Sequence, residues 1–390
     1  MSWSNVALSK LVDIKGGGTP SKANSEYWNG SIPWASVKDF KSTDLNGASD
    51  YITQEGIDNS ATSLIPRGNL IVPTRMALGK VAINSVDIAI NQDLKALIIK
   101  DESVVDTEYL FRCIQSKSEE IVRQGKGATV KGITVDVLKN LQIPVPPLET
   151  QKKIAAVLEK ADQLRKDCKL LEQELNCLAQ SVFIDMFGDP VTNPKGWDMK
   201  ALSDLAIIVT GNTPSRAKPE YYGSYIEWIK SGNINTPSDY LTIAEEYLSE
   251  SGKKVGRVVQ SGSVLMTCIA GSPDCIGNVA IADREVAFNQ QINALVPIEK
   301  KLNTDFLYIL LKVAKKIIQS ASTNSMKGII SKSKLESIQL PFPSYDEQCD
   351  FSAIYRKLQK VVKEQQEQVI ETEFMFNSLM QKAFKGELTL

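Results

Sequence analysis

The chain has 390 residues, of which 43% are hydrophobic, and 45 Lys and Arg stand against 46 Asp and Glu for a formal net charge of −1. A chain of this length predicts two or more domains, and the near-neutral charge argues against binding nucleic acid through bulk electrostatics. There is no histidine, which excludes catalytic sites built on Ser-His-Asp or Cys-His partners.

Short motifs give no catalytic or metal centre either. The six cysteines form no C-x-x-C pair, so we expect no zinc ribbon, no metal site and no disulfide framework, but free thiols in a reducing cytoplasm. No secretory or membrane-spanning segment and no phosphate-binding glycine loop is visible. The stretch Asn193-Pro194-Lys195-Gly196 lacks the aromatic residue of an adenine-methyltransferase motif. We therefore expect a cytoplasmic protein without a catalytic residue.

Residues 1–147 have the sequence pattern of a mixed α/β (α+β) globule. Short β-branched runs, such as Gly68 to Pro73 and Lys80 to Asn84, are separated by Gly, Pro, Asn and Asp, and residues 107–121 favour a helix. The span is an ordinary domain size.

A long helix is predicted next, within residues 148–190. Pro144, Pro146 and Pro147 cannot lie inside a helix. Residues 149–187 contain neither Gly nor Pro, and Gly188 stands where a C-terminal cap belongs. Such a helix measures roughly 58 Å at about 1.5 Å per residue. Apolar residues three and four apart predict a coiled-coil seam, which consists of Ile154, Val157, Ala161, Leu164, Cys168, Leu171, Leu175, Leu178 and Val182.

The second half of the chain repeats the first. Leu11 to Ser21 aligns with Leu205 to Ser215, 194 positions further on, and short matches continue in the same order to the end of each half. Chance similarity does not explain matches that keep one order and a nearly constant offset. We therefore predict a second globule at residues 191–343 and a second long helix at residues 344–390. The further matches are Trp34 with Trp228, Asn91 with Asn289, Lys131 with Lys327, and Ser181 to Phe187 with Ser378 to Phe384.

The second long helix begins with a capping box, in which Ser344 is followed three residues later by Glu347. Its predicted seam contains two polar residues, Gln365 and Thr372. They either fix the register of the helix pair or face water, and the sequence leaves both readings open. Two helices of equal length in one chain are expected to pair antiparallel, with a pseudo-twofold relation between the halves. The seam residues are Leu358, Val362, Gln365, Val369, Thr372, Phe376, Leu379 and Ala383.

The order globule, long helix, globule, long helix resembles the specificity subunits of type I restriction-modification enzymes over residues 1 to about 388. Pro-Pro-Leu-Glu-Thr-Gln at a helix start and Phe-Gly-Asp-Pro at its end carry the resemblance, together with the duplication. The resemblance implies two target recognition domains, each reading one half of a split double-stranded DNA site. It also implies helices that serve as spacer and dock.

The same resemblance implies the partners. Two modification subunits would carry S-adenosylmethionine and methylate adenine, so this chain would need no cofactor of its own, and restriction-motor subunits could join the complex. The half-sites should be centred about 34 Å apart, one turn of DNA, and the helices are long enough to hold that spacing.

Residues that contact DNA are expected where the two copies share backbone chemistry but differ in side chains. The loops at 17–22 and 211–216 combine glycine, hydroxyls and a cation, which suits phosphate contact, although a plain connecting loop would look the same. Residues 123–132 and 319–328 are the favoured recognition loops. Arg75, opposite Thr267 or Cys268, would read guanine or form a surface salt bridge. Trp34 and Trp228 are expected to pack in the core. The candidate DNA-binding residues are Thr19, Ser21, Lys22, Lys38, Arg75, Arg123, Lys126, Thr129, Lys131, Thr213, Ser215, Arg216, Lys218, Lys230, Asn233, Asn324, Ser325 and Lys327.

Two other classes of protein are considered. A coiled-coil adaptor that holds two protein-binding domains fits the neutral charge, but it does not explain unequal cationic loops on a repeated fold. A carboxylate enzyme could use Asp93 or Asp136, yet neither aligns with an acidic residue in the other half. We therefore expect a DNA-reading subunit, with the adaptor as the alternative.

Overall fold

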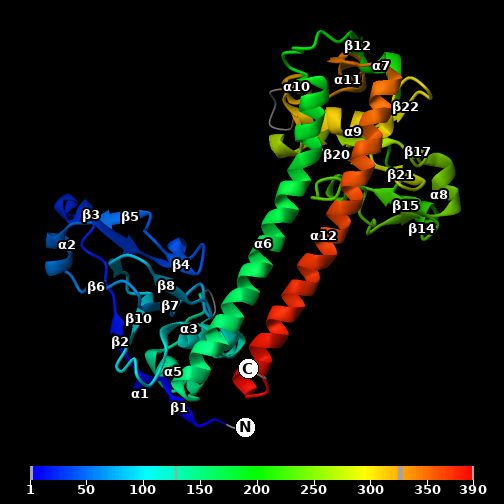
Figure 1. Cartoon of the computed structure of the whole chain (residues 1–390). Helices are drawn as coiled ribbons and strands as arrows, with labels where there is room; N and C mark the ends of the chain where they lie inside the picture. Colours follow the sequence, from blue (N-terminus) through cyan, green and yellow to red (C-terminus); the bar gives the residue numbers. More distant parts are fainter. Residues whose placement is uncertain (1–2, 128–129, 324–327, 389–390) are drawn as a thin grey trace. The chain divides into compact units, whose positions relative to one another are not determined.

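The computed structural model describes residues 3–127, 130–323 and 328–388, and the chain divides into two compact units. The first unit comprises Met1–Lys169 with Glu367–Leu390, and the second comprises Leu170–Gln366. Each unit therefore holds one globule and a stretch of each long helix, α6 (Leu148–Phe187) and α12 (Tyr345–Lys385). Within each unit the two helix stretches run in opposite directions (Figure 1).

The first globule contains a five-stranded sheet in the order β2-β10-β7-β8-β4 and a four-stranded sheet in the order β5-β3-β9-β6. β7 (Leu70–Pro73) and β9 (Ile88–Ile90) are buried along their whole length, which explains their continuous apolar sequence. The other strands are β1 (Asn5–Ala7), β2 (Val12–Gly16), β3 (Trp28–Ala35), β4 (Asp44–Leu45), β5 (Asp50–Ile52), β6 (Ser63–Ile65), β8 (Ala82–Asn84), β10 (Leu94–Ile99) and β11 (Gln142–Pro144). The helices are α1 (Leu8–Leu11), α2 (Gln54–Asp58), α3 (Thr107–Ser116), α4 (Ser118–Arg123), α5 (Val135–Lys139), η1 (Ser25–Tyr27) and η2 (Val37–Asp39).

The second globule repeats this plan, with sheets in the orders β13-β22-β18-β20 and β14-β16-β15-β21-β17. Its strands are β12 (Met199–Ala201), β13 (Ala206–Thr210), β14 (Tyr222–Gly223), β15 (Ile226–Ile229), β16 (Tyr247–Leu248), β17 (Val258–Val259), β18 (Val264–Thr267), β19 (Ile269–Ala270), β20 (Val279–Ile281), β21 (Val286–Phe288), β22 (Ile292–Pro297), β23 (Gly328–Ile329) and β24 (Gln339–Pro341). Its helices are α7 (Leu202–Leu205), α8 (Glu250–Val255), α9 (Thr304–Val313), α10 (Lys315–Ser320), α11 (Lys332–Ser337), η3 (Pro219–Tyr221), η4 (Ser231–Asn233) and η5 (Pro273–Cys275).

The pairing of strands confirms the duplication. β3 lies parallel to β9, with Trp34 opposite Ala89, and β15 lies parallel to β21, with Trp228 opposite Ala287. Both tryptophans are buried, as predicted, and each indole donates to the backbone carbonyl at the equivalent loop position, Gly18 or Asn212. The two halves are therefore the same fold built from different sequences.

Each globule shares its core with the long helices. In the first unit, buried side chains of α3 and β11 cluster with Leu158 of α6 and Phe376 of α12. In the second unit, Phe306 of α9 packs on Phe183 of α6 at a ring-centroid distance of 5.4 Å, and Phe183 packs on Phe351 of α12 at 5.4 Å. Separating a globule from the long helices would expose these apolar side chains to water, which would be unfavourable.

The ends of the long helices follow the predicted signals. Gly188 adopts φ +80° and its N–H donates to the carbonyl of Ile184 at 2.8 Å, which completes the C-terminal turn of α6. At the start of α12, the Glu347 N–H donates to the Ser344 hydroxyl at 3.4 Å, and the Glu347 carboxylate accepts from the Ser344 N–H at 2.9 Å. The capping box is therefore confirmed.

The predicted seam of α6 is only half correct. Val157, Leu164, Leu171 and Leu178 are 36% to 47% exposed. The positions one residue further on from these four are less exposed instead. These buried or half-buried residues are Leu158, Arg165, Glu172 and Ala179. The other predicted positions, Ile154, Ala161, Cys168, Leu175 and Val182, are buried or half-buried.

The predicted seam of α12 is confirmed at every position, since each of its residues is buried or half-buried. Burial excludes the reading in which Gln365 and Thr372 face water, because their exposed fractions are 5% and 9%. The Thr372 hydroxyl is satisfied within its own helix, where it donates to the carbonyls of Gln368 and Val369 at 2.9 and 3.0 Å.

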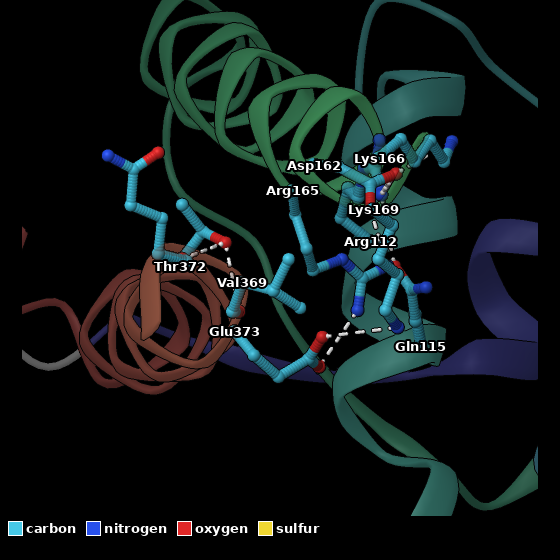
Figure 2. A network of polar contacts seen from close by, with 10 residues as sticks. Arg112, Gln115, Asp162, Arg165, Lys166, Lys169, Val369, Thr372 and Glu373 are labelled. Carbon is cyan, nitrogen blue, oxygen red and sulfur yellow. Dashed lines mark hydrogen bonds and ion pairs between the residues drawn. The ribbon is translucent and has the colours of Figure 1, made fainter. Parts of the chain in front are cut away.

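A buried ion-pair network fastens the first globule to the helices (Figure 2). Arg112 of α3 approaches the Asp162 carboxylate of α6 at 3.0 Å, and both side chains are nearly inaccessible to solvent. Arg165 and Lys166 approach the same carboxylate at 2.6 and 3.0 Å, and Arg165 also pairs with Glu373 of α12 at 3.0 Å. One carboxylate thus joins the globule to the helix that follows it.

The second unit makes the same connection with other residues. Asp239, in the loop before β16, accepts hydrogen bonds from Tyr308 at 2.5 Å, Tyr355 at 2.8 Å and Gln359 at 2.8 Å, and pairs with Lys312 at 3.1 Å. Burial would raise the pKa of Asp239, but the charge of Lys312 and the hydrogen bonds from the tyrosines outweigh it and lower the pKa. Each globule is therefore joined to its own helix by its own set of polar contacts.

Candidate nucleic-acid interface

A glycine-rich loop and an Asn-Gln turn meet at the surface of the first globule. The Gly18 N–H donates to the carbonyl of Ile90 at 3.0 Å, and the Thr19 hydroxyl donates to the side-chain carbonyl of Gln92 at 2.5 Å. The turn is shaped by Asn91, whose side chain accepts from the Asp93 N–H at 3.1 Å. Thr19 and Gln92 are both exposed.

The second globule builds the same arrangement. The Asn212 N–H donates to the carbonyl of Phe288 at 3.1 Å, and the Thr213 hydroxyl donates to the side-chain carbonyl of Gln290. Asn289 accepts from the Gln291 N–H at 3.1 Å and shapes the turn as Asn91 does. The predicted Thr19 and Thr213 therefore occupy equivalent places beside a glutamine.

Arg75 lies next to this turn, where its guanidinium is 3.7 Å from the Asp93 carboxylate. The loop that carries Lys126 and Lys131 comes to the same place. Lys126 and Gly132 exchange two backbone hydrogen bonds of 2.9 Å, and the Lys131 carbonyl accepts from the Met76 N–H at 3.2 Å. Arg75, Lys126 and Lys131 are exposed, so the structure brings these three predicted cations together on one surface of the first globule.

The equivalent surface of the second globule has no arginine at this place. Pro73 of β7 lies opposite Leu94 as Thr267 of β18 lies opposite Ile292, so two residues further along each chain segment the counterpart of Arg75 is Ile269. The sequence alignment with Thr267 or Cys268 was wrong by one or two residues, because it misplaced the insertion. Four predicted residues of these loops, Thr129, Asn324, Ser325 and Lys327, lie outside the described residues.

Two predicted cations of the second globule are held in a local ion-pair cluster. Arg216 approaches Glu246 at 2.6 Å and lies over the rings of Tyr222 and Trp228, 4.3 and 5.2 Å from their centroids. Lys230 pairs with the same carboxylate. Hydrogen bonds from Lys230 and Arg216 lower the pKa of Glu246. The cluster is solvent-accessible, so a phosphate could replace Glu246 at little cost.

Several of the remaining predicted residues contact other residues of the same globule. Lys38 pairs with Asp50 at 2.7 Å, and the Lys218 ammonium lies 3.3 Å from the Tyr221 hydroxyl. Ser21, Lys22 and Ser215 stand exposed in their loops, where the Ser21 carbonyl accepts from an indole N–H at 3.1 Å and that of Ser215 accepts from a backbone N–H at 3.1 Å.

Asn233 and Arg123 serve the structure of their own segments. The Asn233 side chain accepts from the Lys230 N–H at 3.0 Å and donates to the carbonyl of Ile243 at 3.0 Å. Arg123 pairs with Glu119 at 3.6 Å and lines a groove together with Phe376 of α12. Neither residue joins the surface around the Asn-Gln turn.

Sequence reasoning missed the two glutamines. Gln92 and Gln290 stand at the same place in the repeat, next to asparagines that the alignment had already matched. The presence of glutamine at this place in both copies was the available signal. It also missed Asp50 and Glu246, which lie far from their cationic partners in the sequence.

The two carboxylates considered for catalysis lie apart in different surroundings. Asp93 pairs with Arg75, and Asp136 pairs with Lys139 of the same short helix at 3.7 Å. Within residues 3–127, 130–323 and 328–388, no group of three or more Cys, Asp or Glu side chains could hold a metal ion. Over the same residues, no helix is both long and apolar enough to cross a membrane.

Comparison with known proteins identifies the repeated domain. The family model for the type I restriction modification DNA specificity domain matches residues 1–176 and again residues 194–372. The MjaIX specificity subunit of Methanocaldococcus jannaschii is 30% identical over 235 residues, which cover 55% of this chain and 54% of that protein. The EcoR124I/EcoR124II specificity subunit of Escherichia coli is 40% identical over 164 residues, 40% of each chain. The matches thus span about half of these relatives or less.

Solved structures share the fold over almost the whole chain. The S subunit of a type I restriction-modification system from M. genitalium has 15% identity and a TM-score of 0.58, over 98% of this chain and 96% of that one. A chain from a structure of complex assembly and conformational transition in the type I R-M system has 18% identity and a TM-score of 0.68, over 99% and 98%. With a family model that matches both halves, this chain belongs to the type I restriction modification DNA specificity family.

Proposed function

We propose that this chain selects the DNA site of a type I restriction-modification complex and has no catalysis of its own. One observation carries the proposal. The two globules present the same Asn-Gln turn on the same scaffold, while the position beside it is Arg75 in one and Ile269 in the other. A reader of two unlike half-sites needs a common framework with different side chains at the base edges.

The proposed division of labour follows the segments of the sequence. Residues 1–147 and 191–343 are the two target recognition domains, each reading one half of a bipartite duplex site. Residues 148–190 and 344–390 are the spacer and docking helices. Both helices run without interruption, which supports a fixed gap between the half-sites. Inserting seven residues into both helices should change that gap in the methylated motif.

The exposed apolar positions of α6 support docking of another protein. Val157 and Leu164 in the first unit, and Leu171 and Leu178 in the second, recur every seven residues and are exposed. Heptad-spaced apolar residues are the usual seam for an additional helix. We assign them to contact with two modification subunits, which would bring S-adenosylmethionine and much of the affinity for phosphate that a chain of net charge −1 lacks. Restriction-motor subunits would join the same cytoplasmic complex.

The docking assignment is tested by Leu164→Asp. The variant should fold normally, because Leu164 is already 47% exposed, but it should no longer co-purify with the modification subunit of the same host. Gln163→Asp adds the same charge at the adjacent exposed residue and is the matched control. Normal co-purification of Leu164→Asp, together with Val157→Asp, would show that this face is not the dock.

DNA contact is proposed for the exposed candidates around the turn, with Arg75 as a base reader and Lys126 and Lys131 at phosphates. The purified complex with its modification subunits should retain fragments of the host genome that share one bipartite motif. Omitting this chain should abolish that enrichment. Enrichment without a motif, or protein partners in place of DNA, would favour the adaptor alternative.

A further inference from the structure

The same two side chains meet at the same place in both globules. Thr19 donates to the side-chain carbonyl of Gln92, and Thr213 donates to that of Gln290. All four residues are exposed. An exposed pair of polar side chains contributes little to stability, so its repetition on the proposed DNA-binding surface calls for another use.

The backbone that carries the pair leaves little freedom. A Cβ at Gly17 would lie 2.0 Å from the carbonyl oxygen of Ile90, and one at Gly211 would lie 2.1 Å from that of Asn289. Both distances are far below van der Waals contact, so only glycine lets the loop lie this close to the turn. The Trp34 indole fixes the other side of the first loop by donating to the Gly18 carbonyl at 3.0 Å. The pair is therefore presented on a rigid platform.

The hydrogen-bonding pattern decides what the pair can bind. Because each glutamine uses its carbonyl oxygen to accept from threonine, its planar amide group turns the two N–H donors outward. Within residues 3–127, 130–323 and 328–388, neither amide nitrogen has a protein acceptor. The outward face of each pair is thus rich in donors, and it suits a ligand that offers only acceptors. Adenine recognition by glutamine would instead need the carbonyl oxygen as well.

We propose that Thr19–Gln92 and Thr213–Gln290 are two equivalent phosphate clamps, one for each half-site of the DNA. This inference rests on the proposed function. The phosphate backbone is the part of DNA that two different half-sites share, and contacts to it fix the register of a protein without reading sequence. Identical pairs would hold each globule in the same register relative to the phosphate backbone of its half-site. The unequal residues beside them, Arg75 and Ile269, would then reach different base edges.

The test uses the complete complex with its modification subunits and a duplex that carries the methylated motif. In a series of duplexes, each phosphate in turn is replaced by a neutral methylphosphonate. Wild-type complex should lose affinity, roughly 10-fold, at one phosphate in each half-site. Gln92→Ala should bind about 10-fold more weakly and become insensitive to the replacement at its own phosphate only. Gln290→Ala should do the same at the equivalent phosphate of the other half-site.

Gln142→Ala and Gln339→Ala are the matched controls, because these glutamines are also exposed and equivalent in the repeat but lie on β11 and β24. Both should bind like wild type. The inference is overturned if Gln92→Ala and Gln290→Ala bind like wild type, or if either changes the preferred base at a position while keeping its sensitivity to every methylphosphonate. If wild-type complex itself shows no motif-dependent binding, the proposed function fails instead.

Discussion

Removing the carboxylate of Asp162 should lower the stability of the first unit strongly. Its side chain is 2% exposed and that of Arg112 is 6% exposed. Asp162→Ala would leave the Arg112 guanidinium buried without a carboxylate, and the Arg112 Nε already lacks a hydrogen-bond partner among the described residues. Breaking one side of a buried pair typically costs about 3 to 5 kcal/mol. For a unit of this size, that loss lowers the melting temperature by roughly 6 to 20 °C.

The measurement is made by differential scanning calorimetry and urea unfolding. The unfolding transition of the first unit is followed separately from that of the second. Asp167→Ala, at an exposed residue of the same helix, should change stability by less than about 0.5 kcal/mol. The double variant Arg112→Met/Asp162→Leu should recover most of the loss, because well-packed apolar residues replace buried ion pairs at little cost. A loss below about 1 kcal/mol for Asp162→Ala would refute the reasoning.

Three further predictions concern other parts of the chain. Gly17→Ala should push its loop away from Ile90 and abolish DNA binding by one half-site without unfolding the globule, as measured by duplex binding and circular dichroism. Asp239 has a pKa below 3.8 in the fold, so its stabilisation is present above about pH 4 and is lost as the pH falls through the lowered value; Asp239→Asn should flatten that acid loss in melting curves from about pH 6 to pH 2. Gln348→Ala removes three hydrogen bonds to backbone groups and should cost about 2 to 3 kcal/mol, with faster amide exchange near Asn303.

Much of the fold could be predicted because its signals are local. Gly188 and the Ser344–Glu347 capping box mark helix ends through the residues that stand there. The duplication was visible because matched segments kept their order. The seam of α6 was not fully predictable, since leucines occupy both the inward position 158 and the outward position 164. A heptad pattern shows that leucines share a face, but not which protein covers that face.

The candidate site was less predictable because its geometry depends on distant residues. Arg216 looked like a free cation in the sequence, yet Glu246, thirty residues away, pairs with it. The counterpart of Arg75 depended on the register of β7 against β10 and of β18 against β22. Gln92 was within reach of sequence reasoning, because the repeat alignment contained it together with Gln290.

The most direct test of the central claim is a methylation map. This chain is co-expressed with the modification subunit of its own host, and N6-methyladenine is located across the genome by long-read sequencing. The account predicts a single split motif with a fixed gap, which disappears when this chain is omitted. The absence of new methylation, with the complex formed and S-adenosylmethionine supplied, would contradict it.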